Sequence, residues 1–452
     1  MANSNKYEMD MCNGPILKKL IVYSLPLLAT GILQLLFNAV DLIVVGRLRG
    51  SEALAAVGAT SSLVIMLTNL FFGISIGANV VVARFYASGD KEKLKKAVHT
   101  AMTAGVICGI LAMLIGAPLS QQALEWMGTP ENIIDQSSLY LKIYYCGMPF
   151  FLTYNFGSAI LRGIGDTRRP LYFLTAAGFA NIFLNIFLVV CFGMGVEGVA
   201  LGTVLSQFLS CLLVVITLLR TSGDYKIHLN QLGLDRSLLG LMLKIGLPAG
   251  VQGMLINFSI VLIQSSVNSF GSDATAGYAA AGNLNGFMYM AVNAVTQACM
   301  TFVSQNYGAR KFDRIDRVIL TCTGLQLFVG TFVGVLFCIF GEQLLSIYDT
   351  DPNVIAYGMQ NMLVVCAPYA LCGLMDMLPG AMRGMGYSSI PMFITLTGVC
   401  LFRIFWIFTI FPAHRTIMVL FISFPASWVI TITMQAICLM IVRKRERRLA
   451  AL

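Results

Sequence analysis

Charged residues are scarce in this sequence: Asp, Glu, Lys and Arg make up only 11% of its 452 residues, whereas 57% are hydrophobic. An ordinary soluble domain carries about 25% charged residues, which help to cover its surface. The composition therefore argues against a large soluble enzyme, and the hydrophobic fraction also argues against a disordered chain. A polytopic membrane protein is the class that fits.

Several motifs of catalysis and metal binding are missing as well. No Gly-Lys dipeptide occurs, so the chain has no Walker A loop for ATP. The histidines His99, His228 and His414 are far apart and form no H-E-x-x-H zinc motif. The 12 cysteines include no C-x-x-C pair and lie mostly in apolar runs, as expected of small packing residues. We expect no enzyme activity, no catalytic residues, no metal site and no cofactor.

Twelve apolar stretches are long enough to cross a bilayer, which takes about 20 residues. They are residues 16–45, 53–83, 97–119, 134–160, 170–193, 196–220, 241–269, 275–305, 317–341, 354–380, 391–411 and 416–442. The sequence therefore predicts an all-α membrane protein with twelve transmembrane helices. Pro26 in the first stretch and Pro248 in the seventh are expected bend points, because proline removes a backbone donor.

The basic residues that give the chain its positive net charge lie mainly in the loops between these stretches and at their ends. If the N-terminus is cytoplasmic, nearly all of the 30 Lys and Arg residues lie in cytoplasmic segments, and the outer loops keep only Arg47, Arg49 and Arg415. This bias is the positive-inside rule, so it indicates orientation and not nucleic-acid binding. It predicts a multi-pass protein of the plasma or inner membrane with both termini cytoplasmic. The basic tail after residue 442 is interpreted as an orientation anchor rather than a lipid-specific site.

The two halves of the chain repeat each other. Residues 162–165 (Arg-Gly-Ile-Gly) recur as 383–386 (Arg-Gly-Met-Gly), 221 positions later, and Tyr86 and Tyr307 have the same separation. We expect two duplicated six-helix lobes, 1–220 and 241–452, joined by a cytoplasmic linker at 221–240. Duplicated lobes around a cavity are typical of alternating-access carriers, although fold alone gives no substrate.

Asp41 is the most informative ionisable residue within a predicted span. Gln34, Asn38 and Asp41 are spaced i, i+4 and i+7, so they share one helix face. Such a carboxylate can bind Na⁺ or, when buried, take up a proton. The alternative is a structural Asp near a helix end.

Amide and hydroxyl side chains in the next spans extend this polar set. Asn181 and Asn185 are one turn apart in the fifth span, and Thr203 lies in the sixth. They supply neutral oxygen ligands for a cation or partners for a carboxyl group. The alternative is that they hydrogen-bond one helix to another.

Four stretches resemble the MATE (multidrug and toxic compound extrusion) transporters, and the likeness extends over both halves. They are residues 37–41 (Phe-Asn-Ala-Val-Asp), 50–58 (Gly-Ser-Glu-Ala-Leu-Ala-Ala-Val-Gly), 161–167 (Leu-Arg-Gly-Ile-Gly-Asp-Thr) and 181–185 (Asn-Ile-Phe-Leu-Asn). The resemblance implies a V-shaped, two-lobe carrier that exports cationic or amphipathic drugs in exchange for H⁺ or Na⁺. It implies that Asp41 is the central coupling residue, with Asn181 and Thr203 as its polar partners.

The sequence departs from many of these transporters at two places. Asn185 stands where many have a second acid, and Ser158, with Asn155 one turn away, stands where some have Asn. A single carboxylate weakens a Na⁺ site, which benefits from several anionic oxygens, so H⁺ is the favoured coupling ion.

In the second half the candidates are less defined. The seventh span offers Gln252 and Asn257 where some relatives have Glu. Asp376 is either a second coupling or substrate carboxylate or a charge paired with a loop cation. Arg403 either pairs with Asp376 or packs against backbone carbonyls.

We therefore expect a secondary antiporter for small cationic organic substrates, acting as a monomer in the bilayer. Protonation or Na⁺ binding at Asp41 would bend the first span at the hinge residue Pro26. The alternative is a lipid-linked oligosaccharide flippase of the same superfamily fold, but its anionic head group would need several cations within the spans. Only Arg403 and Lys142 lie there.

Overall fold

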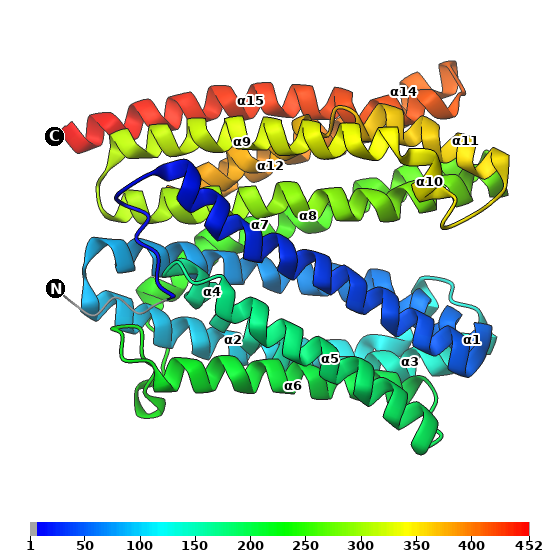
Figure 1. Cartoon of the computed structure of the whole chain (residues 1–452), viewed down its shortest axis with the longest axis horizontal. Coiled ribbons are helices and arrows are strands. Elements are labelled where there is room, and N and C mark those ends of the chain that lie inside the picture. The colour runs from blue at the N-terminus through cyan, green and yellow to red at the C-terminus, as the bar shows by residue number, and fades with distance from the viewer. Residues whose placement is uncertain (1–6, 452) are drawn as a thin grey trace. The chain divides into compact units, whose positions relative to one another are not determined.

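The computed structural model describes residues 7–451, so Lys6, one of the basic residues near the N-terminus, lies outside it. Every regular element in this part of the chain is helical, and no strand occurs in it (Figure 1). The α-helices are α1 Ile16–Ser88, α2 Lys91–Trp126, α3 Glu131–Cys146, α4 Met148–Gly163, α5 Arg168–Cys191, α6 Val196–Arg220, α7 Arg236–Asn268, α8 Ser272–Gly308, α9 Phe312–Ile339, α10 Gly341–Leu345, α11 Pro352–Asn361, α12 Tyr369–Gly384, α13 Ser389–Thr395, α14 Phe402–Ala413 and α15 Ile417–Ala451. Short η elements are the 3₁₀ turn η1 Leu229–Gln231 and the π-helices η2 Met362–Cys366 and η3 Leu396–Leu401.

Helix α1 contains two of the predicted spans. The loop expected between residues 46 and 52 is replaced by a break at Gly50, whose backbone has φ 85° and ψ −177°. Only glycine adopts this conformation without strain, so the helix turns there and continues at once. Pro26 lies inside the first part of α1, as the sequence predicts.

The helix count agrees with twelve spans once broken helices are joined. Nine helices among residues 7–451 are long and apolar enough to cross a membrane, and the bent pair Pro352–Cys366 and Tyr369–Gly384 makes up to ten. One of the nine is α1, which holds two spans, and α3 with α4 fills the stretch predicted as the fourth. These two short helices meet at Gly147, just before Pro149. The all-α, multi-span fold class is confirmed.

The duplication seen in the sequence is also present in the backbone. Gly50 and Gly271, 221 positions apart, have nearly the same dihedral angles, with φ of 85° and 100° and ψ of −177° and −178°. Gly165 and Gly386, at the same separation, have φ of 98° and 96°. Equivalent positions therefore use the same left-handed turn, which supports a six-span repeat.

The chain forms two compact units that exchange the beginnings of two helices. The first unit comprises Ala29–Gly250 together with the residues up to Asp10, and the second comprises Met11–Leu28 and Val251–Leu452. The beginning of α1 thus packs in the second unit, whereas the beginning of α7 packs in the first. Pro26 and Pro248 each lie two residues before the point where their helix passes from one unit to the other.

Each exchanged segment has specific contacts in its host unit. In the second unit, Tyr23 of α1 donates to the Thr301 hydroxyl at 3.2 Å, and its ring packs edge-on against Phe302. In the first unit, Gly73 of α1 lies directly against the α7 backbone at Gly246 and Gly250. This G-x-x-x-G spacing on α7 brings the two helix backbones close together.

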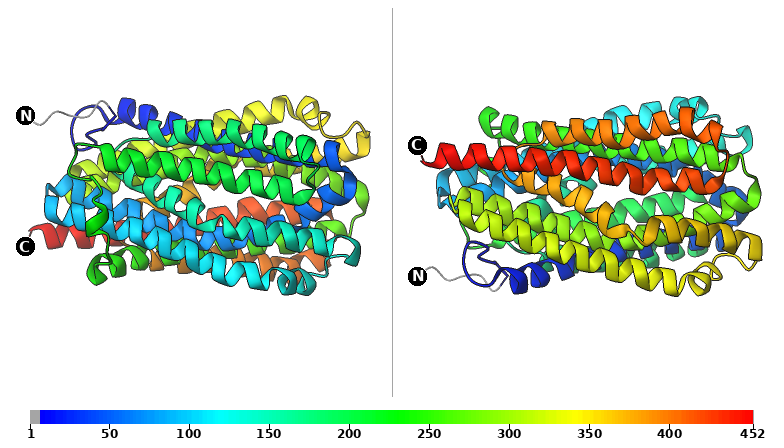
Figure 2. Two further views of the ribbon diagram at one scale, coloured as in Figure 1. Left: turned by 90° about the horizontal axis from the view of Figure 1, so that it is seen from below. Right: turned by 90° about the horizontal axis from the view of Figure 1, so that it is seen from above.

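Within each unit, helices adjacent in sequence pack as neighbours. In the first unit α5 lies beside α6, and α2 lies against both α3 and α4. In the second, α8 packs against α9, α11 and α12. Helix α14 lies beside α15, and the right-hand view of Figure 2 shows the two as the orange and red helices. The largest buried side chains include Phe156 in the first unit and Phe302 and Phe421 in the second.

Two glutamates near the chain ends each accept hydrogen bonds from two tyrosines, of which only Tyr86 and Tyr307 occupy equivalent positions in the repeat. In the first unit Glu8 accepts hydrogen bonds from Tyr86 at 2.9 Å and Tyr225 at 3.1 Å. In the second, Glu446 accepts from Tyr307 at 2.8 Å and from Tyr387 at 2.6 Å. We call these contacts the Glu8 clamp and the Glu446 clamp.

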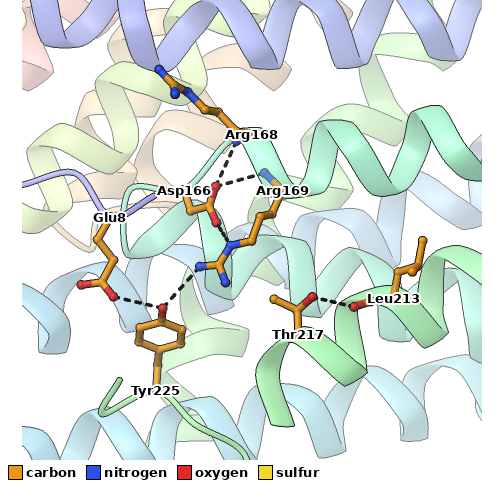
Figure 3. A network of polar contacts seen from close by, with 7 residues as sticks. All are labelled: Glu8, Asp166, Arg168, Arg169, Leu213, Thr217 and Tyr225. Carbon is orange, nitrogen blue, oxygen red and sulfur yellow. Dashed lines mark hydrogen bonds and ion pairs between the residues drawn. The ribbon is translucent and has the colours of Figure 1, made fainter. Parts of the chain in front are cut away.

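The Glu8 clamp continues into a charged network at the turn between α4 and α5 (Figure 3). The Tyr225 hydroxyl accepts from Arg169 at 3.3 Å, and Arg169 forms an ion pair with the buried carboxylate of Asp166. Asp166 also accepts from the backbone amides of Arg168 and Arg169, both at 3.1 Å. These contacts join the linker between the two repeats to the N-terminal segment.

Replacing Gly73 by Ala should destabilise the protein, because the new Cβ would lie 2.2 Å from the backbone nitrogen of Gly250. Neither backbone can yield without a shift of its helix, and overpacking of this kind typically costs about 1–3 kcal/mol. We expect a clear loss of thermal stability in detergent, measured at one scan rate. Gly58→Ala is the matched control on the same helix, because nothing lies within 4 Å of the position that its Cβ would take. Equal melting temperatures for the two variants would contradict the close approach.

Candidate functional site

A cavity of about 430 Å³ lies within the first unit. Its walls come from α1, α3, α4, α5 and α6. The lining residues are mainly aromatic, amide and hydroxyl side chains: Gln34, Phe37, Asn38, Asp41, Leu42, Val57, Thr60, Ser61, Val64, Ile65, Thr68, Tyr140, Tyr144, Phe151, Tyr154, Leu174, Ala177, Gly178, Asn181, Thr203, Ser206, Gln207 and Ser210. Asp41 is the single charged residue in this set.

Asp41 begins a chain of hydrogen bonds that crosses three helices. Its carboxylate accepts from the side-chain amide of Asn185 at 2.6 Å. The Asn185 side-chain amide also donates to the side-chain oxygen of Asn181 at 3.4 Å, and the Asn181 side-chain amide donates to the Thr203 hydroxyl at 3.3 Å. Thr203 donates in turn to the backbone carbonyl of Val199 at 3.0 Å. The four residues proposed from sequence as the coupling site therefore lie together.

Close packing fixes this arrangement from two sides. A Cβ on Gly178 of α5 would lie 1.9 Å from the ring of Phe37, so α1 rests directly on the α5 backbone one turn before Asp41. A Cβ on Gly202 of α6 would lie 2.0 Å from the Asn185 side-chain oxygen. Asn185 is fully buried. The amide therefore has little freedom to turn away from Asp41.

The aromatic side of the cavity was not identified from the sequence. Tyr140 and Tyr144 of α3 line it together with Phe151 and Tyr154 of α4. The four residues are spaced i, i+4, i+11 and i+14, which places them on one helix face, so this aromatic repeat is the signal that could have identified the wall. Their rings give the cavity aromatic walls beside a single carboxylate, and a cation is attracted both to the carboxylate and to the faces of the rings.

Of the four supporting residues proposed from sequence, two line the cavity and two do not. Gln34 and Asn38 line the cavity beside Asp41, as their shared helix face predicts. Asn155 and Ser158 are buried on α4 and are not among the lining residues. Asn155 instead donates to the backbone carbonyl of Phe151 at 2.8 Å.

Arg403 does not pair with Asp376, so that sequence-based alternative is wrong. The guanidinium donates to Ser427 at 3.1 Å and to Ser259 at 3.3 Å, and it lies 4.3 Å from the ring centre of Phe424. Hydroxyls and an aromatic face, rather than a carboxylate or backbone carbonyls, therefore surround this buried cation. The residue is 3% exposed.

Asp376 has a different cation and a different hydrogen-bond donor. The nearby charge is that of Arg383, the basic residue in the last turn of α12, and Tyr289 of α8 donates to the carboxylate. Arg383 also donates to the buried side-chain oxygen of Gln252 at 2.7 Å, which brings this predicted residue into the same group. Asn257 is exposed and donates to the backbone carbonyl of Gly253 at 2.9 Å. Among residues 7–451, no cluster of His, Cys, Asp and Glu could hold a metal ion.

Comparisons with known proteins agree with this architecture. The MatE family model matches residues 26–187 and again 248–409. The "Probable multidrug resistance protein YoeA" of Bacillus subtilis (strain 168) is 29% identical over 389 residues, which cover 84% of each chain. The "Probable multidrug resistance protein NorM" of Thermotoga maritima is 24% identical over 391 residues, which cover 85% of this chain and 83% of its own.

A solved structure has the same fold. It is described as the outward-facing conformation of a multidrug resistance MATE family transporter of the MOP superfamily. It aligns with a TM-score of 0.91 at 19% identity, over 99% of this chain and 100% of the other. The comparisons define a multi-pass membrane transporter and confirm that it is not an enzyme. Because the family model covers both repeats, the chain belongs to the MatE family, the MATE transporters that its sequence motifs resemble.

Replacing Gly178 by Ala should separate α1 from α5, because the new methyl group would overlap the Phe37 ring. Overpacking predicts a loss of about 1–3 kcal/mol, measured as thermal stability. The double variant Phe37→Leu/Gly178→Ala should recover much of this loss, since leucine lacks the outer ring atoms in the overlap. Additive effects of the two substitutions would show that Phe37 does not rest on Gly178.

Proposed function

We propose that the protein is a secondary antiporter that exports cationic or amphipathic organic compounds in exchange for H⁺ by alternating access. The observation that supports it most directly is the hydrogen-bonded Asp41 carboxylate, the only charge lining a polar and aromatic cavity. The names of the relatives in Bacillus and Thermotoga, both called probable multidrug resistance proteins, support the same class of substrate.

Exchange follows from competition for one negative charge. A cationic substrate is attracted to the Asp41 carboxylate and to the rings of Tyr140 and Tyr144. A proton on the same carboxylate removes that attraction. Because each ligand disfavours the other, uptake of a proton from outside promotes release of the substrate there.

Two features favour H⁺ over Na⁺ as the coupling ion. Asp41 is the only acid among the lining residues, whereas a Na⁺ site benefits from several anionic oxygens. The carboxylate also has the nitrogen of Asn185, and not its oxygen, as its nearest partner. Na⁺ binding would require neutral oxygens from Asn181 and Thr203 to complete the site.

Pro26 is the proposed hinge that couples the site to a conformational change. Asp41 follows it by 15 residues on α1, which corresponds to about 22 Å of helix. The α1 helix passes from the second unit to the first at Leu28 and Ala29. A change of charge at Asp41 would alter the packing of α1 on α5, and the missing amide of Pro26 lowers the cost of bending there.

The flippase alternative is not favoured. The related proteins carry multidrug resistance names, and no Lys or Arg lines the cavity within the described first unit. A pyrophosphate head group would need such cations. We further propose that the transporter acts as a monomer in the plasma membrane, with both termini cytoplasmic, as the charge bias of its loops indicates.

Asp41→Asn should abolish proton-driven efflux. Purified protein in liposomes would be tested with a fluorescent organic cation, first under a pH gradient alone and then under a Na⁺ gradient alone. We expect Asp41-dependent movement under the pH gradient. Asp135→Asn, the same chemical change at an exposed position on α3, is the matched control and should retain wild-type rates. Wild-type efflux by Asp41→Asn would reject the assignment, and movement with Na⁺ alone would reject H⁺ coupling.

Asn185→Ala should shift the pH dependence of transport rather than abolish it. The substitution removes the amide that donates to Asp41 at 2.6 Å. A hydrogen bond to a charged group contributes about 1.5–3 kcal/mol, and 1.36 kcal/mol corresponds to one pH unit. We expect the midpoint of the transport–pH curve to rise by about one to two units. An unchanged midpoint would mean that the contact does not tune proton exchange at Asp41.

A further inference from the structure

A second cavity lies where α15 ends beside α9. Its volume is about 590 Å³, and four of its lining residues are the cations Arg443, Lys444, Arg447 and Arg448. Asp316 of α9 is the one acid in the lining, and Leu439 and Met440 form its apolar edge. This cavity lies entirely within the second unit and has no part in the Asp41 site. The sequence alone suggested only that the basic tail sets orientation.

The four cations share one side of a rigid helix. Residues 443 and 447 are one turn apart, as are 444 and 448, so their side chains stand in two adjacent rows. Asp316 forms ion pairs with both Arg443 and Arg447, which fixes the first row against α9. The end of α15 is thus a continuous helix with ordered contacts and not a free basic tail.

The Glu446 clamp holds the opposite side of the same turn. Glu446 is 7% exposed and binds both Tyr307 and Tyr387. Burial, together with this hydrogen bond, raises the pKa of Tyr387, so the phenol stays a donor at neutral pH. The Glu446 clamp therefore fixes the rotation of α15 about its own axis, so that the two rows of cations line the cavity.

The cavity retains an excess of positive charge. Asp316 satisfies two arginines, whereas Lys444 and Arg448 have no carboxylate within 4 Å in the described part of the chain. Directly before the cations, Met440 and Ile441 are 64% and 65% exposed. In a membrane-spanning helix, such an exposed apolar surface contacts acyl chains, and the adjoining cations lie at the level of the head groups.

We propose that this cavity binds the phosphate of an anionic phospholipid. Lys444 and Arg448 contact the phosphate, Arg443 and Arg447 add positive charge from the adjacent row, and the acyl chains lie along Met440 and Ile441. Ordered cations next to a transmembrane helix bind anionic head groups through charge, and each Lys or Arg near the surface adds about a factor of five in affinity. The site is separate from the proposed antiport site.

A second basic cavity, in the first unit, provides the comparison. It has a volume of about 330 Å³, and its cations Lys91, Lys95 and Lys226 are interspersed with the acids Glu92 and Asp224. Lys91 pairs with Asp224 at 3.2 Å. Because its charges are nearly balanced, we expect no comparable lipid preference there.

The experiment is a lipid titration of the full-length protein, purified and delipidated in detergent, followed by native mass spectrometry. The probes are phosphatidylglycerol, which is anionic, and phosphatidylcholine, which is zwitterionic. The variant is Lys444→Gln/Arg448→Gln, and the matched control is Lys91→Gln/Lys95→Gln. Melting temperatures without added lipid check that both variants are folded.

We expect wild-type protein to bind phosphatidylglycerol more tightly than phosphatidylcholine. The Lys444→Gln/Arg448→Gln variant should bind phosphatidylglycerol about tenfold or more weakly, whereas the control should remain within about twofold of wild type. Equal affinity of wild type and the Lys444/Arg448 variant would overturn the proposal. Glycerol phosphate is the soluble competitor: if it displaced the lipid at equal concentration, the site would be one for free phosphate and the lipid assignment would be wrong.

Discussion

The hydrogen bond between Asp41 and Asn185 is the interaction on which the rest of the first unit depends. A carboxylate among apolar helices is unfavourable unless polar groups surround it. The structure meets this requirement with residues from three helices, because Asn185 is held by Gly202 of α6 and Asp41 is held by the packing of Phe37 on Gly178. The same contacts that make the charge tolerable also create the cavity beside it. In this unit, the contacts that form the candidate site are therefore also contacts that pack its helices together.

The second unit keeps the repeat of the backbone but reverses the sign of the buried charge. Its glycine turns match those of the first unit, yet the cation Arg403 is surrounded there by Ser259, Ser427 and Phe424. Phe424 stands 221 positions after Thr203, so an aromatic ring replaces a hydroxyl of the first repeat. The carboxylate of Asp376 in the same unit is near Arg383 and Tyr289. The two units thus share a scaffold and differ in electrostatics, which supports placing the proposed ion-exchange site in the first unit alone.

Much of this could be predicted from the sequence, because the relevant signals are local or periodic. The length of the apolar stretches predicted the spans, and the constant separation of equivalent residues predicted the repeat. Helical spacing predicted that Gln34, Asn38 and Asp41 share one face. Contacts between distant segments could not be predicted in this way. Arg403 and Asp376 were suggested as partners because both are charged and lie within predicted spans, but Arg403 donates to Ser427, and Asp376 interacts with Arg383 and Tyr289. The two glutamate clamps likewise could not be predicted, because they depend on contacts between residues far apart in the sequence. The break at Gly50 depends on a backbone conformation that the glycine permits but does not require.

The exchange of helix beginnings has a consequence for biosynthesis. The second unit includes Met11–Leu28, which are made long before the rest of that unit, whereas the first unit needs α7 as far as Gly250. Met11–Leu28 must therefore remain without their native partners until the second half of the chain begins to enter the membrane. Domains that fold in order during synthesis normally complete the N-terminal one first. Here neither unit can complete its fold from one half of the chain alone. The order in which the residues are synthesised therefore differs from the order in which the units assemble.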